Sequence, residues 1–279
     1  MEGEMDGLGR RGLLALAGAV AIGMKARAAE DALAKVKSSG TLRVGTETQF
    51  APFDFLENGK ATGLNYDLFA ELGKDMGLKI EWVALPWESV LPGLDAGKFD
   101  MVAGPATITK ARMERYRFTP PIAEATCGIL KKAGDNSIDK PTDIAGKAVG
   151  SGKATAQLEQ LRRYAATLNP QPQIREYVDF SQAYADLAAG RIVAVANSLP
   201  NIAYVAAQRP DTFALVKTPF GDKSYFGYIG RKDPEYASLM DAVDAEILKL
   251  KADGRLAKLQ EKWFKTTFDT PERVTNPAV

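Results

Sequence analysis

The sequence is most constrained by a pattern of short apolar strands and amphipathic helices that runs once through the first hundred or so residues and then starts again. In the first run, strands are expected at residues 42–46, 78–84 and 99–103, and helices at 66–76 and 89–96. The second run predicts strands at 127–131, 148–150, 173–177, 192–196 and 212–216, and helices at 155–168 and 182–189. Alternation of this kind is typical of an α/β fold with mainly parallel sheets.

The end of the chain returns to the first unit. Residues 225–230 are again strand-like, and helices are expected at 235–251 and 254–264. The second unit is therefore inserted in the first, which predicts two lobes joined by two crossings, near 129–132 and 219–225. We assign 29–130 and 223–279 to the first lobe and 131–222 to the second. A ligand would bind in the interlobe cleft, and the lobes would close on it about a hinge.

The first 28 residues have the features of a signal peptide. Arg10 and Arg11 precede an apolar run at 13–24, and Ala26-Arg27-Ala28 matches a cleavage pattern. A buried N-terminal helix is the alternative. The pattern predicts export to the periplasm, and because no cysteine follows the cleavage site, no lipid anchor is expected.

Composition excludes several classes of function. The 36 Lys and Arg balance the 35 Asp and Glu, so no nucleic-acid partner is expected. The chain has one cysteine, Cys127, and no histidine, which excludes a Ser-His-Asp triad and a Cys/His zinc site. We expect a monomer that needs no metal or cofactor.

One segment, KFDMVAGPATITKAR at 98–112, suggests a binding site. Gly104 and Pro105 should end the apolar strand, and Thr109 is an expected N-cap for a short helix that carries Arg112. This geometry places a hydroxyl and a guanidinium at the carboxyl end of a strand, where α/β sheets bind ligands. The segment is either a clamp for a carboxylate or a strand–turn–helix with an exposed arginine.

Six segments resemble the polar amino-acid class of periplasmic solute-binding proteins (solute-binding protein family 3), the receptors of ABC importers. They are SSGTLRVGTETQFAPFDF, GLNYDLFAELGKDMGLK, LPGLDAGKFDMVAG, TITKARMERYRFTPPI, YADLAAGRIVAVANS and LKADGRLAKLQEKWF. The resemblance covers essentially all of the chain after the signal. It implies the type II two-lobed periplasmic binding protein fold, a small carboxylate ligand and an ABC permease as partner, without catalysis.

The resemblance also implies ligand-binding residues in the first lobe. Residues matching Thr107 and Arg112 hold the ligand's α-carboxylate in that family, and the carbonyl matching Gly104 accepts a bond from the ammonium. Pro105 stands where the family often has serine, and it lacks both hydroxyl and amide.

Aromatic walls and a distal contact are implied as well. Phe50 and Trp87 match aromatic positions that flank the ligand, and Trp87, after Pro86, is expected to be exposed at a strand end. The alternative is that both aromatics belong to the core. Glu47 matches a position that contacts the distal end of the ligand in some members, although a solvated carboxylate is the alternative.

The second lobe departs more from the family. The turn that donates to the carboxylate corresponds to the segment from Ser151 to Thr155, and either residue is a candidate. At the place of the family's ammonium-binding aspartate this chain has Ser198, beside Asn197. A neutral partner suggests a ligand whose nitrogen is methylated, cyclic or acylated.

Several alternatives remain open at this point. Glu124 or Asp222 could instead supply the missing negative charge for an ordinary ammonium. A cyclohexadienyl (arogenate/prephenate) dehydratase-like enzyme on the same scaffold is the alternative function, but no acid lies within 194–198 to act as its general acid. A sensory or lytic-transglycosylase module is a third, and those carry a further domain.

Overall fold

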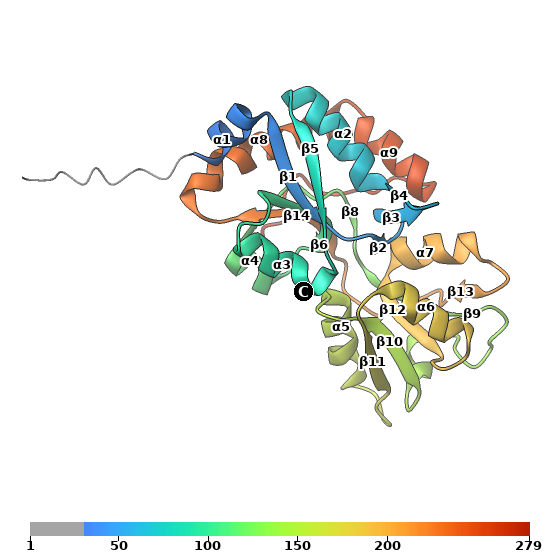
Figure 1. The fold of residues 1–279 in the computed structure, drawn as a ribbon. Helices are drawn as coiled ribbons and strands as arrows, with labels where there is room; N and C mark the ends of the chain where they lie inside the picture. Colours follow the sequence, from blue (N-terminus) through green and yellow to red (C-terminus); the bar gives the residue numbers. More distant parts are fainter. Residues whose placement is uncertain (1–30) are drawn as a thin grey trace, which may run out of the picture.

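The computed structural model describes residues 31–279 and contains two α/β lobes, each built on its own sheet (Figure 1). The signal-peptide prediction lies outside the described residues. In residues 31–279 no helix has the length and apolar character required to cross a membrane.

The first sheet has the strand order β5-β1-β6-β14-β7, and β8 also pairs with β14. Its strands are β1 (Thr41–Thr46), β5 (Lys79–Ala84), β6 (Met101–Thr107), β7 (Tyr116–Phe118), β8 (Ala123–Glu124) and β14 (Tyr225–Arg231). The helices of this lobe are α1 (Ala32–Ser39), α2 (Leu64–Met76), α3 (Trp87–Asp95), α4 (Lys110–Arg115), α8 (Ala237–Ala252) and α9 (Arg255–Phe264). A small separate sheet contains β2 (Gln49–Phe50), β3 (Asp54–Glu57) and β4 (Lys60–Thr62).

The second sheet has the order β11-β10-β12-β9-β13. Its strands are β9 (Cys127–Lys132), β10 (Ala148–Gly152), β11 (Gln173–Tyr177), β12 (Ala194–Ser198) and β13 (Phe213–Leu215). Its helices are α5 (Ala156–Ala165), α6 (Phe180–Ala188) and α7 (Leu199–Gln208). We refer to the halves built on the two sheets as the first and second lobe.

The first connection between the sheets lies earlier than predicted. β8 still pairs with β14 of the first sheet, whereas β9 pairs with β12 and β13 of the second. The chain therefore crosses at Ala125–Thr126, not near residues 129–132, because the apolar run after Thr126 is hydrogen-bonded on both sides within the second lobe. The proposed residue limits of the lobes otherwise stay a prediction.

Both faces of each sheet carry apolar side chains, because side chains alternate between the two faces along a strand. In β12, Ala194 and Ala196 pack into one apolar cluster and Val195 packs into another. In β6, Met101 lies in one cluster and its neighbour Val102 in the next. Successive side chains of a strand point to opposite faces, so continuous apolar runs suit sheets covered by helices on both sides.

Side-chain caps fix where several helices begin. Each capping oxygen accepts a hydrogen bond from the backbone amide three residues later, and the pairs are Asp31–Ala34 (2.9 Å), Thr109–Arg112 (3.2 Å), Thr155–Leu158 (3.1 Å) and Asp179–Gln182 (3.0 Å). Such caps satisfy amides that have no partner within the helix. Thr109 is the N-cap that the sequence predicts.

Pro105 does not end its strand. β6 continues to Thr107, because its ladder with β14 skips the proline: Ala106 pairs with Gly227, and Val102 pairs with Ile229. The amide of Tyr228, opposite the skipped position, donates instead to Thr119 Oγ1 at 3.0 Å. A bulge thus accommodates a residue that has no amide to donate.

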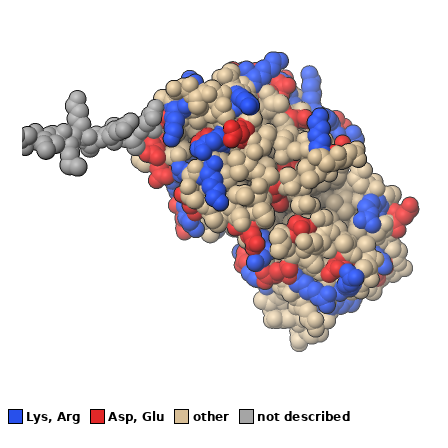
Figure 2. All heavy atoms as spheres, in the orientation of Figure 1, with Lys and Arg blue, Asp and Glu red and all other residues tan. Residues whose placement is uncertain are grey.

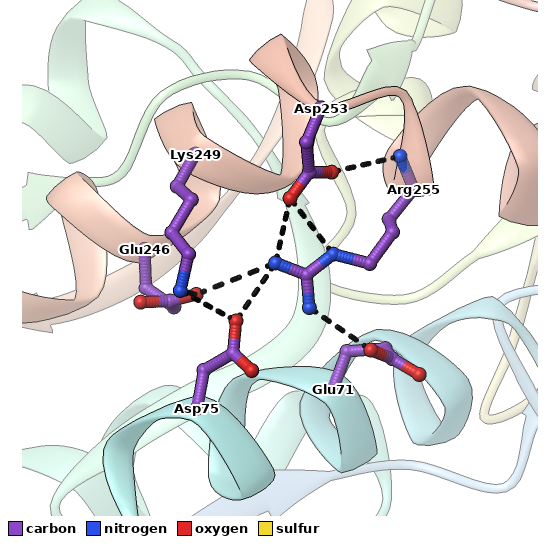
Figure 3. Close-up of polar contacts among 6 residues, drawn as sticks. All are labelled: Glu71, Asp75, Glu246, Lys249, Asp253 and Arg255. Carbon is purple, nitrogen blue, oxygen red and sulfur yellow. Dashed lines mark hydrogen bonds and ion pairs between the residues drawn. The ribbon is translucent and has the colours of Figure 1, made fainter.

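An ion-pair network attaches the C-terminal helices to the first lobe (Figure 3). Arg255 of α9 pairs with Glu71 (3.0 Å) and Asp75 (2.7 Å) of α2, and Lys249 of α8 also pairs with Asp75 (2.7 Å). Hydrogen bonds from Arg255 and Lys249 hold the pKa of Asp75 below its ordinary value. Elsewhere on the viewed face, basic and acidic residues are interspersed (Figure 2).

Candidate functional site

A small cavity lies between the lobes, at the carboxyl ends of β1 and β6. It measures about 10 Å³, which is room for about one water molecule. Seven residues that the sequence singles out line it: Glu47, Phe50, Trp87, Pro105, Thr107, Arg112 and Thr155. Gln157 and Phe226 complete the lining. The lobes are therefore closed around a space smaller than an amino acid.

Arg112 is the cation of this cavity. Its Nη1 donates to the carbonyl of Thr107 at 3.1 Å, and its Nη2 donates to the carbonyl of Ala154 at 3.4 Å. Its guanidinium carbon lies 5.4 Å from the ring centre of Trp87, a cation–π contact. No acidic residue within 31–279 forms an ion pair with it, and burial lowers the pKa of Arg112 to about 10. A half-buried guanidinium held only by neutral groups favours an anionic ligand.

Neutral hydrogen-bonding groups of the second lobe face this arginine. Thr155 caps α5, and its hydroxyl also donates to the Gly152 carbonyl at 2.7 Å. Gln157 Nε2 donates to Thr107 Oγ1 at 3.3 Å, across the cleft. The first-turn amides of a helix have no partner within it, and they favour negative charge. Both lobes thus offer donors to a carboxylate.

Direct bonds between the lobes hold the cleft closed. The carbonyl of Ala154 accepts from Trp87 Nε1 at 3.2 Å as well as from Arg112, and Lys153 pairs with Glu88 at 2.8 Å. Ala154 has a φ of 57°, a left-handed conformation that costs a non-glycine residue roughly 1 kcal/mol. The loop before α5 is therefore strained at the point where its carbonyl meets the first lobe.

The two predicted aromatic walls both line the cavity, and both are buried. The ring centre of Phe50 lies 5.8 Å from that of Phe180, which belongs to the second lobe, and 5.9 Å from that of Phe226. Trp87 is only 7% exposed, so the expectation that it is exposed is wrong. Its position after Pro86 does point it out of the first lobe, but the Ala154 loop of the second lobe covers it.

Two buried carboxyl groups lie behind the aromatics. Glu47 is 9% exposed, and burial together with the charges of Asp54 and Asp179 raises its pKa well above the ordinary value. Burial also raises the pKa of Asp54 to about 7, although Thr46 Oγ1 donates to its Oδ2. Within residues 31–279, Glu47 forms no ion pair. The cavity therefore presents a cation and a carboxyl group, neither paired with an opposite charge among the described residues.

Four predicted residues do not line the cavity. Ser151 Oγ donates to the Ala196 carbonyl at 3.0 Å within the second sheet. Asn197 Nδ2 donates to the Tyr184 hydroxyl at 2.9 Å, and Ser198 Oγ donates to Asn201 Oδ1. Gly104 lies behind Trp87, whose ring is 3.3 Å from where a Cβ would stand.

Between the two second-lobe candidates, Thr155 reaches the cavity and Ser151 does not. Neither of the alternative acids lines it: Asp222 is exposed, and Glu124 accepts from Thr126 Oγ1 at 2.5 Å beside a different groove. In the described part of the chain, no group of three or more Cys, Asp or Glu residues is arranged to hold a metal ion.

Sequence reasoning missed Gln157 and Phe226. Gln157 had a usable signal, because it follows the Thr155 cap by two residues and so belongs to the first turn of a helix whose N-terminus faces the cleft. Phe226 had none, because an apolar residue in an apolar strand looks the same whether it faces a core or a cleft.

Known proteins share this architecture. Residues 42–266 match the family model described as bacterial extracellular solute-binding proteins, family 3. The chain is 32% identical over 262 residues to the L-cystine-binding protein TcyJ of Escherichia coli (strain K12), covering 92% of this chain and 96% of that one.

Solved structures are similar too. An ancestral arginine-binding protein bound to arginine is 32% identical, with a TM-score of 0.74, over 81% of this chain and 98% of that one. The ancestral amino acid-binding protein AncCDT-1, a precursor of cyclohexadienyl dehydratase, is 30% identical, with a TM-score of 0.75, over 83% and 99%. The chain has the two-lobed type II periplasmic binding protein fold and belongs to the bacterial extracellular solute-binding proteins of family 3.

Proposed function

We propose that this protein is an extracytoplasmic receptor that captures an amino acid, or a carboxylate derived from one, and delivers it to an ABC permease. The observation that carries the proposal is Arg112, a half-buried guanidinium that has only carbonyl and aromatic partners among the described residues. TcyJ and the ancestral arginine-binding protein are named for amino-acid ligands, which supports the same class of ligand here.

Capture would follow from the geometry of the two lobes. In an open state, Arg112 and Thr107 of the first lobe would bind the carboxylate, and Phe50 and Trp87 would flank the body of the ligand. Closure would then bring Thr155 and the first turn of α5 onto the carboxylate from the other side. The ligand carboxylate would replace the Ala154 carbonyl as the partner of Arg112, because a charge-assisted bond is stronger than a neutral one.

The nitrogen end of the ligand is the finer part of the proposal. Ser198, at the place of the family's aspartate, is bonded to Asn197 and Asn201, and none of its hydrogen bonds within residues 31–279 involves a carboxylate. This favours a nitrogen that is methylated, cyclic or acylated. Among the described residues that line the cavity, Glu47 is the one acidic group. A ligand with a free ammonium would therefore have to place that ammonium, or a cation at its distal end, beside Glu47.

The alternative function, a dehydratase-like enzyme, receives no support from the relatives. TcyJ is a binding protein, and AncCDT-1 is described as an amino acid-binding precursor of the enzyme rather than as the enzyme. We therefore retain the proposal that this protein is a receptor.

The receptor proposal is tested by native mass spectrometry of the purified protein, which detects a co-purified ligand, followed by a thermal-shift panel. The panel contains free α-amino acids, N-methylated and cyclic derivatives, and matched amines without a carboxylate. We expect carboxylates alone to raise the melting temperature, since a ligand that binds the native state stabilises it by mass action. Stabilisation by the amines to the same extent would contradict the receptor proposal, whereas a preference for free α-amino acids would contradict only the nitrogen-end proposal.

A further inference from the structure

A second cavity lies directly beside the one that holds Arg112. It measures about 340 Å³ and is bounded by β2 and β3 of the first lobe and by α6 and α7 of the second. Phe50 lines both cavities, so its ring is the wall between them. The second cavity is therefore one of the spaces into which a ligand held at Arg112 can extend.

The wall is a contact between lobes and not a fixed partition. Phe50 belongs to the first lobe, and Phe180, whose ring centre lies 5.8 Å away, begins α6 of the second. When the lobes separate, these two rings separate with them. A ligand that enters the open cleft can therefore lie across the position of this contact when the lobes close again.

The two cavities differ in charge. The first contains Glu47 and Arg112, whereas none of the described residues that line the second is charged. Its polar side chains are the Gln49 amide, the hydroxyls of Thr48, Ser181 and Tyr184, and the Asn201 amide, which is almost completely buried. Ser181 Oγ donates to Gln49 Oε1 at 2.9 Å and Asn201 Nδ2 to the Ala51 carbonyl at 2.7 Å, so these groups already bridge the lobes.

The volumes of the two cavities also indicate that a ligand would extend into the second one. The cavity of about 10 Å³ that Arg112 and Phe50 line together holds one water and no amino-acid side chain. A cavity of about 340 Å³ falls within the range of small-molecule sites. Neutral amides and hydroxyls there match an uncharged substituent that both donates and accepts hydrogen bonds.

We propose that the binding site continues past Phe50 into this second cavity, and that the ligand is an amino-acid-type carboxylate with a long, uncharged, hydrogen-bonding substituent. This proposal rests on the proposed function, because Arg112 must hold the carboxylate for the substituent to reach past Phe50.

Calorimetric titration of the full chain with a graded set of amino acids tests the extension. The probes are L-alanine, L-norleucine, L-citrulline, Nε-acetyl-L-lysine and L-arginine. Ser181→Trp fills the second cavity from an exposed position at the start of α6, and Ser181→Ala is the matched control that removes the hydroxyl without filling the space.

We expect citrulline or acetyl-lysine to bind the wild type at least about tenfold more tightly than alanine or norleucine, as one or two hydrogen bonds supply. Ser181→Trp should weaken the binding of the long neutral probes by about tenfold and change the affinity for alanine by less than about twofold. Ser181→Ala should weaken the binding of the long probes less than Ser181→Trp does.

The proposal that the site extends past Phe50 would be overturned if Ser181→Trp affected short and long probes equally, or affected neither. It would also be overturned if arginine bound more tightly than the other probes. Those results leave the receptor proposal standing if Arg112→Ala still abolishes binding. Failure of the wild type to bind any carboxylate would instead overturn the receptor proposal, and the extension with it.

Discussion

The two lobes present different chemistry to the same cleft. The first lobe contributes the ionisable groups, Arg112 and Glu47, and the aromatic walls Phe50 and Trp87, whereas the second contributes the neutral donors Thr155 and Gln157. Three other residues of the second lobe that resemble ligand contacts in sequence, Ser151, Asn197 and Ser198, are instead bonded within that lobe. The difference indicates that the first lobe supplies recognition and that the second supplies closure.

Free energies explain why such a division works. A buried charge is costly unless it is paired, so the charged groups gain most from a ligand of opposite charge. A neutral hydrogen bond contributes only about 1 kcal/mol net, so contacts from the second lobe can form and break without trapping the ligand. The predictions that follow test this comparison, from the largest expected effect to the smallest.

Arg112→Ala should have the largest effect, because it removes every charge-assisted bond to the carboxylate. We expect the affinity for a carboxylate ligand to fall by at least about 100-fold, since each such bond contributes roughly 1.5–3 kcal/mol. Isothermal titration measures the loss. Arg115→Ala, on the same helix but exposed and paired with Asp95, is the control and should bind normally. Retained binding by Arg112→Ala would show that recognition lies elsewhere.

The buried acids should make stability depend on pH. Asp54 has a pKa raised from 3.8 to about 7, so the folded state holds a proton that the unfolded state releases. The stability that Asp54 contributes is then fully present below about pH 4, and it falls as the pH rises to about 7, by an amount on the order of 4 kcal/mol. Melting temperatures measured from pH 4.5 to 8 report this decline.

Asp54→Asn should flatten that decline, leaving only the part due to Glu47, whose pKa is raised in the same direction. The exposed Asp211→Asn is the control and should keep the wild-type slope. An unchanged slope in Asp54→Asn would mean that the charge of Asp54 is well solvated, and the contrast between a charged first lobe and a neutral second lobe would weaken.

Gln157→Ala should have a moderate effect. The change removes the bond from Nε2 to Thr107 Oγ1 across the cleft, one neutral hydrogen bond that assists closure. We expect affinity to fall about three- to tenfold in titration, corresponding to 0.5–1.5 kcal/mol. Gln171→Ala, an exposed loop position, serves as the control. A loss as large as that of Arg112→Ala would break the comparison, because the second lobe would then share in recognition.

Lys153→Ala should have the smallest effect. Its ion pair with Glu88 crosses the cleft at 2.8 Å, but both side chains are substantially exposed. Such pairs contribute about 0–1 kcal/mol and weaken with salt, so we expect less than about a fivefold loss of affinity at low salt and none at high salt. A larger loss that persists in high salt would assign this pair a direct part in binding.

Much of the fold was predictable because local physics determines it. The alternation of strands and helices, the Thr109 cap and the amphipathic α2 and α9 follow from side-chain pattern within a dozen residues. The errors occur where distant strands decide the outcome. β6 continues through Pro105 because it bulges opposite β14, which lies more than a hundred residues later, and β9 joins the second sheet because β12 and β13 pair with it.

The features of the binding site likewise fall into two groups, those that the local sequence predicts and those that only tertiary contacts determine. The sequence by itself determined the α/β architecture and the capped helix that carries Arg112 beside Thr107, because these depend on local chemistry and strand direction, whereas the resemblance to the family suggested Glu47 and Phe50. Only the tertiary structure decided that Thr155 and not Ser151 reaches the cavity, that Ser198 bonds to Asn201, and that Trp87 is buried. These outcomes depend on how two separately folded sheets approach each other, and contacts between distant segments leave no periodic trace in either segment.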